Sequence, residues 1–554
     1  MATLCTGDRL NPADLLRLPR GAAERAALEL QALGHIARSG LVGIESPQKV
    51  TSLLRTLHRF GGLGALPGRA AIRDPNGTAI ADELGTVSFA ELDRRTNALA
   101  NEWRKRGIGD GSGVSILCRN HRGFLDATFA AAKLGARALY LNTDFAGPQV
   151  TDVCAREGTD ALVYDEEFAE VVAGAAAPRG RFIAWADGES DVPTLEQLIA
   201  SGDSAAPPPP GERPSVVMLT SGTTGTPKGA PRDTPSSLVP LGALLSKTPF
   251  RAGEATYVAA PMFHSLGFAN SLLAVGLGST IVCRRRFDAV AAVEGIERES
   301  CSAIIVVPVM LSRILALGPE RIEAHDLSSL RIVFCSGAQL EADLVTRAMD
   351  ALGDVVYNLY GSTEVAYATI ATPEDLRAAP GCAGRVPIGT TVRLYDEEGQ
   401  PVEGSDRSGR IFVGNGFEFA GYTGGGSKQV IDGLMSSGDV GHFDSAGRLF
   451  IDGRDDEMIV SGGENVFPHE VEELLFHHPE IDDAAVIGVD DEKFGKRLRA
   501  FVVLAAGSDL DDDAVREHVK ANLARYKVPR DVVVLDELPR NPSGKILKRE
   551  LATR

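Results

Sequence analysis

Residues 219–229 read LTSGTTGTPKG, and this stretch decides how the rest of the chain is interpreted. It follows an apolar run at 216–219 that is typical of a strand, and it combines glycines, hydroxyl side chains and Lys228. Glycines let backbone N–H groups converge on an anion, hydroxyls donate further hydrogen bonds, and lysine supplies a positive charge. The stretch therefore predicts a phosphate-binding loop, with a flexible linker as the alternative. It is not a Walker A motif, because Pro227 precedes Lys228 and Gly229 follows it.

Size and charge limit the classes of protein that fit. A chain of 554 residues predicts two to four domains at roughly 100–200 residues each. With 44% hydrophobic and 24% charged residues, it has the composition of a globular protein. The net charge of −18 repels phosphate backbones, so we expect no nucleic-acid partner. The seven cysteines are scattered, which predicts reduced thiols and no zinc site. We find no secretory signal and no apolar run long enough to span a membrane, so we expect a cytoplasmic protein.

The pattern of elements predicts an α/β fold. From Val114 onwards, short β-branched runs alternate with longer helical patterns, which is typical of helices layered on mainly parallel strands. A capping box at 88–91 opens one such helix. After Arg454 the pattern changes to helix, two strands, helix and strand, which indicates a small α+β domain. The strands are expected at 114–118, 161–164, 216–219, 280–283, 303–307, 331–335 and 355–360.

A second polar segment, NLYGSTE at 358–364, follows the strand expected at 355–360. It therefore falls at a carboxyl edge, where open α/β sheets bind ligands. Glu364 suits Mg²⁺, which prefers one or two carboxylates together with substrate phosphates. Tyr360 offers a flat face to a nucleotide base. Taken singly, a helix cap for Glu364 and a core position for Tyr360 are the alternatives.

Together with these two segments, three further ones carry a resemblance to a known family. They are SGD at 437–439, the block from GRDDE at 453–457 to SGGEN at 461–465, and PRNPSGK at 539–545. All occur in the order of the adenylate-forming superfamily, which the chain resembles from about residue 70 onwards and which includes AMP-dependent acyl-CoA synthetases, luciferases and adenylation domains of peptide synthetases. The resemblance implies that a carboxylate attacks the α-phosphate of ATP to give acyl-AMP and pyrophosphate, and that a thiol then displaces AMP.

The resemblance also implies roles for individual residues. Lys545 would bridge the carboxylate and the α-phosphate, Glu364 would hold Mg²⁺, and His264 in PMFHSLG would gate the acyl pocket; these three form the expected catalytic set. Asp456 would be the hinge of a mobile C-terminal domain, and the loop of Ser461, Gly462, Gly463 and Glu464 would face CoA. ATP and AMP contacts are expected from Thr220, Ser221, Gly222, Thr223, Thr224, Gly225, Lys228, Gly337, Ala338, Gln339, Asn358, Tyr360, Gly361, Ser362, Thr363, Asp439 and Arg454.

We therefore expect a helical N-terminal extension at 1–65, an ATP- and acyl-binding adenylation domain at 66–454 and a mobile C-terminal lid domain at 455–554. An apolar pocket is expected from Phe268, Ala269, Ser271, Leu272, Val307, Val309 and Met310. Such a pocket suits a medium- or long-chain fatty acid. Together with the resemblance, it implies a fatty acid–CoA ligase that uses ATP, Mg²⁺ and CoA. An aryl-acid ligase, or transfer of the acyl group to a carrier-protein thiol, is the alternative. Retention of Lys228, Glu364, Asp439, Arg454 and Lys545 together argues against a nucleotide-binding protein without catalysis. A homodimer, and a peripheral membrane contact through the N-terminal extension, are left open.

Overall fold

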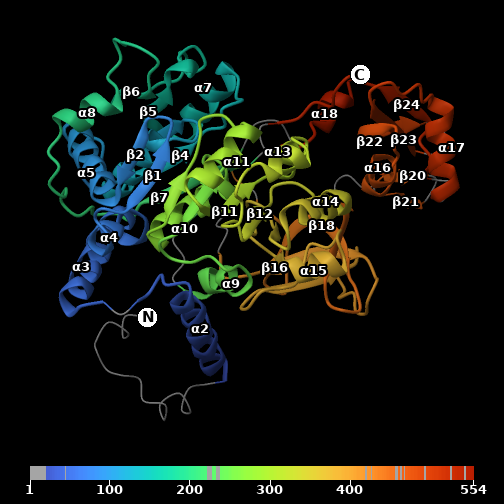
Figure 1. Cartoon of the computed structure of the whole chain (residues 1–554), viewed down its shortest axis with the longest axis horizontal. Helices are drawn as coiled ribbons and strands as arrows, with labels where there is room; N and C mark the ends of the chain where they lie inside the picture. Colours follow the sequence, from blue (N-terminus) through green and yellow to red (C-terminus); the bar gives the residue numbers. More distant parts are fainter. Residues whose placement is uncertain are drawn as a thin grey trace.

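The computed structural model describes residues 20–43, 45–220, 228–232, 237–417, 421–423, 425, 427–455, 459–461, 464–466, 468–491, 495–523, 527–541 and 544–553. Within these ranges the strands form four sheets, which we call sheets A to D, with helices packed against them (Figure 1). The mixed α/β fold, with a large N-terminal part and a small C-terminal domain, confirms the predicted fold class. The domain boundaries at 65 and 454 stay a prediction.

Sheets A and B form the framework of the large part. Their central strands run parallel, and antiparallel strands close three of the four edges. Sheet A has the order β14 (Thr369–Ala371), β13 (Val356–Tyr360), β12 (Ile332–Cys335), β11 (Cys301–Val306), β9 (Ala255–Val258), β10 (Thr280–Val282), β1 (Thr78–Asp82) and β2 (Gly85–Ser88). Sheet B has the order β6 (Arg181–Trp185), β5 (Thr159–Asp165), β3 (Gly113–Leu117), β4 (Arg137–Tyr140), β7 (Ser215–Thr220) and β8 (Lys228–Arg232).

Helices cover these sheets. One large buried core joins most of them to sheets A and B, so the two sheets are parts of the same packed unit, and a second, smaller core lies on the other face of sheet B. The helices of this part are α2 (Arg20–Arg38), α3 (Pro47–Gly64), α4 (Leu66–Arg73), α5 (Phe89–Lys105), α6 (Arg122–Lys133), α7 (Gly147–Arg156), the 3-10 helix η1 (Glu166–Phe168), α8 (Leu195–Ser201), α9 (Val239–Lys247), α10 (Ser265–Leu277), α11 (Ala289–Arg298), α12 (Pro308–Leu315), α13 (Pro319–Glu323), α14 (Ala342–Leu352) and α15 (Pro373–Ala378).

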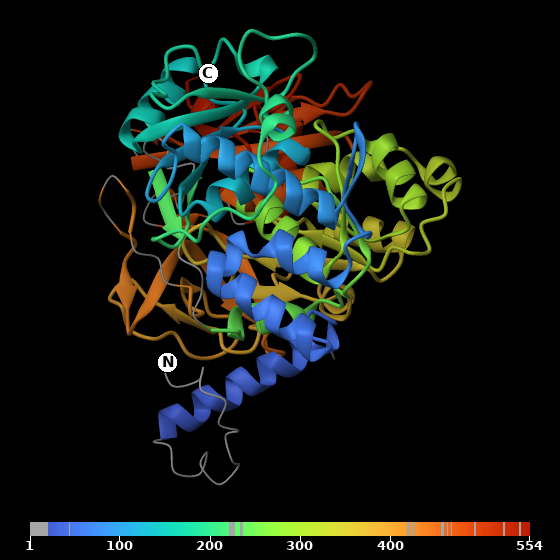
Figure 2. The ribbon, with the colours of Figure 1, turned by 90° about the vertical axis from the view of Figure 1, so that its left-hand side faces the viewer.

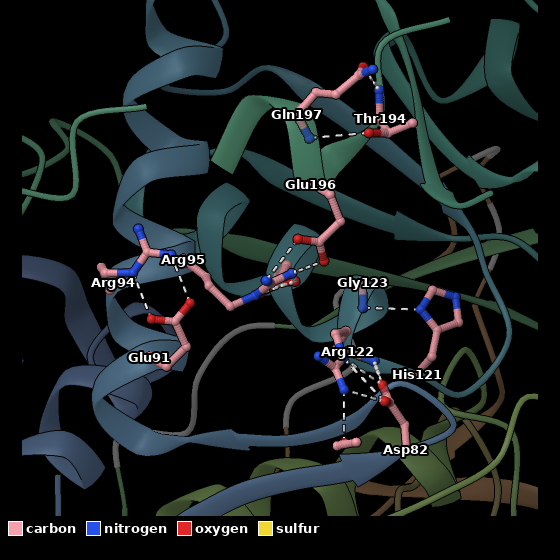
Figure 3. Close-up of polar contacts among 12 residues, drawn as sticks. Asp82, Glu91, Arg94, Arg95, His121, Arg122, Gly123, Thr194, Glu196 and Gln197 are labelled. Carbon is pink, nitrogen blue, oxygen red and sulfur yellow. Dashed lines mark hydrogen bonds and ion pairs between the residues drawn. The ribbon is translucent and has the colours of Figure 1, made fainter. Parts of the chain in front are cut away.

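The start of α5 shows half of the predicted capping box. The Ser88 hydroxyl accepts a hydrogen bond from the Glu91 backbone N–H at 3.2 Å, as expected for an N-cap. The Glu91 carboxylate does not reach back to the cap. It forms an ion pair with Arg94 at 2.6 Å, because that guanidinium lies one turn further along the same face (Figure 3).

A buried arginine joins the helices beside sheet B. Arg95 on α5 contacts Asp126 on α6 at 2.6 Å. It also contacts Glu196 on α8 at 2.5 Å (Figure 3). At the start of α6, His121 accepts a hydrogen bond from the Gly123 backbone N–H through Nδ1, and its Nε2 contacts Asp165 at 2.7 Å. Both ring nitrogens of this buried histidine are thus engaged by the protein. These side chains hold elements together through contacts within the protein.

The C-terminal part contains two further sheets. Sheet C is antiparallel, with β15 (Thr391–Tyr395), β16 (Gly409–Gly414), β18 (Leu434–Phe443) and β17 (Val430–Ile431), and with β19 (Leu449–Arg454) on β18. Sheet D has the order β21 (Glu464–Val466), β20 (Ile459–Ser461), β23 (Gly495–Leu504) and β22 (Ile481–Asp491), with β24 (Asp531–Val534) on β23. Helices α16 (Pro468–Phe476) and α17 (Asp512–Asn522) share a separate buried core with sheet D, and α18 (Lys548–Leu551) ends the described chain. In Figure 1 these red elements form a group of their own.

The N-terminal segment packs against the large domain. Helix α2 lies along the lower edge of the molecule in Figure 2 and contacts α9, where a Cβ added at Gly242 would lie 2.4 Å from the Ala32 Cβ. Further along, Leu41 and Leu66 both approach Gly276 on α10. This segment is therefore part of the wall around the large domain. None of the helices in the described ranges is long and apolar enough to cross a bilayer.

Candidate active site

A cavity of about 1240 Å³ lies between the large part of the chain and the C-terminal domain. Polar residues at the carboxyl ends of β12 and β13 line one region of it, as expected where parallel strands end. Thirteen of the predicted site residues line this cavity: His264, Gly337, Ala338, Gln339, Asn358, Tyr360, Gly361, Ser362, Thr363, Glu364, Asp439, Arg454 and Lys545. Side chains from distant parts of the sequence thus face one space.

The predicted phosphate loop connects two strands of sheet B. β7 and β8 pair antiparallel, with Thr220 opposite Lys228, so both residues lie at the end of the hairpin that carries the loop. Ser221, Gly222, Thr223, Thr224 and Gly225 lie outside the described residues.

The same holds for part of the predicted hinge and CoA loop. Asp456, Gly462 and Gly463 lie outside the described residues. Ser461 and Glu464 are paired opposite one another at the ends of β20 and β21. The roles of these residues stay predictions.

Asp439 and Arg454 face each other inside the cavity. They are register partners on β18 and β19, and the guanidinium lies 3.2 Å from the carboxylate. The Tyr360 hydroxyl donates a hydrogen bond to Asp439 at 2.6 Å and contacts the Ser437 hydroxyl at 3.1 Å. Burial raises the pKa of the Asp439 carboxyl, and Arg454, Tyr360 and Lys545 oppose that shift. Tyr360 therefore holds Asp439 in place, a role that its predicted use as a stacking face did not include.

Glu364 is held by two hydroxyl groups. Ser362 donates to one carboxylate oxygen at 2.9 Å, and Tyr422 donates to the other at 2.6 Å. Both donors orient the carboxylate at the cavity wall, where one side of each oxygen can still accept a ligand. An oriented carboxylate at the cavity wall offers the oxygen ligands that Mg²⁺ prefers, so this residue fits the metal. Tyr422 and Ser437 are contacts that the motifs did not predict.

Lys545 is presented by a tight turn of the C-terminal domain. The Asn541 side chain accepts a hydrogen bond from the Lys545 backbone N–H at 2.9 Å, and Asn541 donates its own N–H to the Lys545 carbonyl at 2.9 Å. Gly544 in this turn has φ +79°, and a Cβ there would lie 2.5 Å from Cγ1 of Val309. Glycine lets the turn approach α12 closely, which places the exposed Lys545 at the cavity that also holds Asp439.

His264 stands at the start of α10, at the apolar end of the cavity. Burial lowers the pKa of its imidazole, which is therefore neutral near pH 7 and brings no positive charge to this end. Of the predicted acyl-pocket residues, Phe268, Ala269, Leu272 and Val309 line the cavity. Ser271, Val307 and Met310 are buried in the core and are not among the lining residues, because their side chains pack against neighbouring elements.

Residues that the family motifs do not cover also line the cavity. Leu41, Gly62, Leu63 and Leu66 contribute to its wall from the N-terminal segment. The sequence carried no signal that assigned these four residues to the cavity. Gln339, expected beside the adenine, contacts His469 on α16 at 2.6 Å and so connects the segment after β12 to the C-terminal domain.

Comparison with known proteins agrees with this geometry. A family model described as "AMP-binding enzyme" matches residues 68–423, and one described as "AMP-binding enzyme C-terminal domain" matches residues 470–545. The chain belongs to the family of AMP-binding enzymes, which confirms the resemblance to adenylate-forming enzymes.

Relatives and solved structures match over most of their length. The chain is 36% identical over 502 residues to a feruloyl-CoA synthase of Amycolatopsis sp, a match that covers 90% of this chain and 99% of the relative. It is 30% identical over 472 residues to the long-chain-fatty-acid–CoA ligase FadD13 of Mycobacterium tuberculosis, with 84% and 92% covered. The structure of the o-succinylbenzoate CoA synthetase MenE from Bacillus subtilis, in complex with its acyl-adenylate intermediate, superposes with a TM-score of 0.76 at 26% identity, with 88% and 97% covered.

Proposed function

We propose that the protein is an acid–CoA ligase that converts a carboxylic acid and ATP into acyl-AMP and pyrophosphate, and then transfers the acyl group to CoA. The observation that carries this proposal is the convergence of Lys545, Glu364, Asp439 and Arg454 on one cavity whose other end is apolar. A carboxylate and a triphosphate repel each other, so the site must neutralise charge and orient both reactants. The arrangement supplies both requirements.

In the first step an oxygen of the substrate carboxylate attacks the α-phosphorus, the bond to the bridging oxygen breaks, and pyrophosphate leaves. Lys545 donates hydrogen bonds to the carboxylate and to the α-phosphate, where negative charge builds up. Asp439, held by Tyr360, accepts hydrogen bonds from the ribose hydroxyls, and Arg454 adds a donor. Glu364 would hold Mg²⁺, which neutralises phosphate charge when bound. We assign the β- and γ-phosphates to Lys228 and the loop hydroxyls.

In the second step the thiolate of CoA attacks the acyl carbon, and AMP leaves with the electron pair of the broken C–O bond. The apolar end of the cavity holds the acyl group during both steps. His264 lies at this end and is neutral, so it forms no ion pair with the substrate carboxylate. We assign the hinge to Asp456 and the CoA-facing loop to residues 461–464. A movement of the C-terminal domain between the steps removes Lys545 and admits the thiol.

For the acid we propose an aryl acid, with a medium- or long-chain fatty acid as the second candidate. The cavity wall combines leucines of α10 and the N-terminal segment with Phe268, a lining that suits a ring as well as an alkyl chain. The 36% identity to a feruloyl-CoA synthase supports the aryl acid, and the 30% identity to a fatty acid–CoA ligase supports the second candidate.

Pyrophosphate release over a panel of aryl and straight-chain acids, with and without CoA, tests both levels of the proposal. We expect acid-dependent pyrophosphate release and an acyl-CoA product only when CoA is present. Acyl-AMP that never becomes acyl-CoA would refute the ligase assignment. A higher kcat/KM for straight-chain acids than for aryl acids would refute the aryl preference alone.

A further inference from the structure

The outer side of α3 carries a stripe of exposed apolar side chains. Val50, Leu54 and Leu57 follow one another at helical spacing and are 40%, 60% and 38% exposed. Leu53 and Phe60 of the same helix are buried, on the side where α3 packs against α4 and α6. A surface helix normally presents polar side chains to water, whereas α3, at the edge of the molecule in Figure 1, is apolar on its outer side as well.

Exposed apolar side chains are concentrated in this part of the molecule. Among the described residues, eleven large apolar side chains are exposed, and six of them lie between positions 30 and 57: Leu30, Leu33, Val42, Val50, Leu54 and Leu57. The other five are spread from Leu84 to Val534. Single exposed apolar residues are ordinary on protein surfaces, but a cluster marks a surface that contacts a partner.

The charge of the same segment is opposite to that of the whole chain. Residues 46–73 contain one lysine, four arginines and no aspartate or glutamate, in a protein with a net charge of −18. Arg55 and His58 are exposed on α3 itself. No carboxylate in the described part of the chain forms an ion pair with Arg55. A partner that fits this surface must therefore combine negative charge with an apolar layer.

We propose that the outer side of α3 is a docking surface for an anionic lipid bilayer. The apolar stripe inserts at the boundary of the acyl chains, and the basic side chains contact the headgroups. A second copy of the chain is disfavoured, because a symmetric interface would place the same basic residues opposite one another. Acidic residues elsewhere in the protein contribute little, since charges are screened beyond about 10 Å at 0.1 M salt.

The docking surface continues into the wall of the substrate cavity. Gly62 and Leu63 belong to α3 and line that cavity, one turn beyond the apolar stripe. Docking would thus bring lipid next to the apolar end of the cavity. The inference does not depend on the reaction that the enzyme catalyses.

Co-sedimentation of the full chain with lipid vesicles tests the proposal. One set of vesicles contains phosphatidylcholine alone, and the other contains phosphatidylcholine and phosphatidylglycerol in equal parts. We expect the wild type to bind the anionic vesicles at least about tenfold more tightly, because each basic residue near the surface contributes about fivefold. Arg55→Gln should weaken binding to the anionic vesicles about fivefold and leave binding to neutral vesicles unchanged. Leu54→Glu should weaken binding at least about tenfold, because it places a charge among the acyl chains.

Leu84→Glu is the matched control. Leu84 lies in the turn between β1 and β2 and is 58% exposed, so its replacement removes an equally exposed leucine and adds the same charge as Leu54→Glu. We expect this control to bind both kinds of vesicle as the wild type does. Melting temperatures of all variants should match that of the wild type, because the replaced side chains are exposed.

Wild-type protein that binds neither kind of vesicle, or binds both equally, would overturn the proposal. An equal loss in Leu54→Glu and Leu84→Glu would show that net charge alone decides binding and would overturn the assignment to α3. Sedimentation velocity without lipid tests the competing occupant, because a wild-type dimer that Leu54→Glu dissociates would assign this surface to a second copy of the chain. If Leu54→Glu fails to fold, Arg55→Gln decides the question, since binding unchanged by that substitution would also overturn the proposal.

Discussion

Replacing Gly544 by alanine tests how the C-terminal domain delivers Lys545. An alanine Cβ would lie 2.5 Å from Cγ1 of Val309, far inside the separation of about 3.5–4 Å at which carbon atoms attract. Relieving such an overlap costs about 1–3 kcal/mol. The turn can avoid this cost by moving away from α12, which withdraws Lys545 from the cavity. At 1.36 kcal/mol per tenfold change, adenylation should slow by roughly 5- to 160-fold.

Gly507 provides the matched control. It lies in the same domain with φ +87°, close to the +79° of Gly544, and a Cβ there would meet nothing within 4 Å. In both variants an alanine in the left-handed backbone conformation destabilises the fold by about 1–2 kcal/mol, but only the alanine at position 544 would overlap with α12. The difference between the two variants therefore isolates the contact.

The assay separates the two half-reactions. Pyrophosphate release with the fastest acid measures adenylation, and acyl-CoA formed from supplied acyl-AMP measures the second step. We expect Gly544→Ala to lose the first activity and keep the second, with a melting temperature close to that of Gly507→Ala. Adenylation within twofold of the control, or an equal loss in both half-reactions, would refute the reasoning.

Three further changes test other parts of the site and the fold. Lys545→Ala should abolish pyrophosphate release and leave acyl-CoA formation from supplied acyl-AMP largely intact, so a parallel loss would contradict its role. Tyr422→Phe removes the 2.6 Å hydrogen bond to Glu364. Because a hydrogen bond to a charged group contributes about 1.5–3 kcal/mol, the Mg²⁺ concentration for half-maximal rate should rise about tenfold. An unchanged Mg²⁺ dependence would show that this bond is not needed. Hydrogen bonding from Arg119 lowers the pKa of the Glu167 carboxyl from 4.5 to about 2, so this carboxylate stabilises the fold above pH 4.5 and the contribution is lost as the pH falls towards 2. Glu167→Gln should accordingly lower the melting temperature more at pH 7 than at about pH 3, and an equal effect at both pH values would contradict this.

Local patterns predicted the parts of the site that local sequence controls. The segment 358–364 follows a strand, so its polar residues had to lie at a carboxyl edge, and Asn358 and Glu364 line the cavity there. The strand patterns likewise predicted the parallel core of sheet A. In these cases alternation along the chain decides which side chains face the same way.

Contacts across long sequence separations could not be read in this way. The pairing of Asp439 with Arg454 depends on the register of β18 and β19, and the bond from Tyr422 to Glu364 joins residues 58 positions apart. Periodicity indicates that a helix has an apolar face but carries no information about what that face covers. The N-terminal segment was expected to be an extension because the family resemblance begins near residue 70, although Leu63 lines the same cavity as Lys545.

The distribution of charge around the cavity links substrate binding to the position of the C-terminal domain. The protein carries a net charge of −18, yet Lys428 and Arg454 of the large part and Lys545 of the C-terminal domain all face the cavity. Without ATP, the attraction of Lys545 to this region depends on carboxylates such as Asp439, which Arg454 already neutralises. Bound phosphates would add negative charge between the two parts and so favour the arrangement with Lys545 in the cavity. In the proposed reaction, release of pyrophosphate removes most of that charge, so withdrawal of the lysine and entry of the thiol should follow the first step.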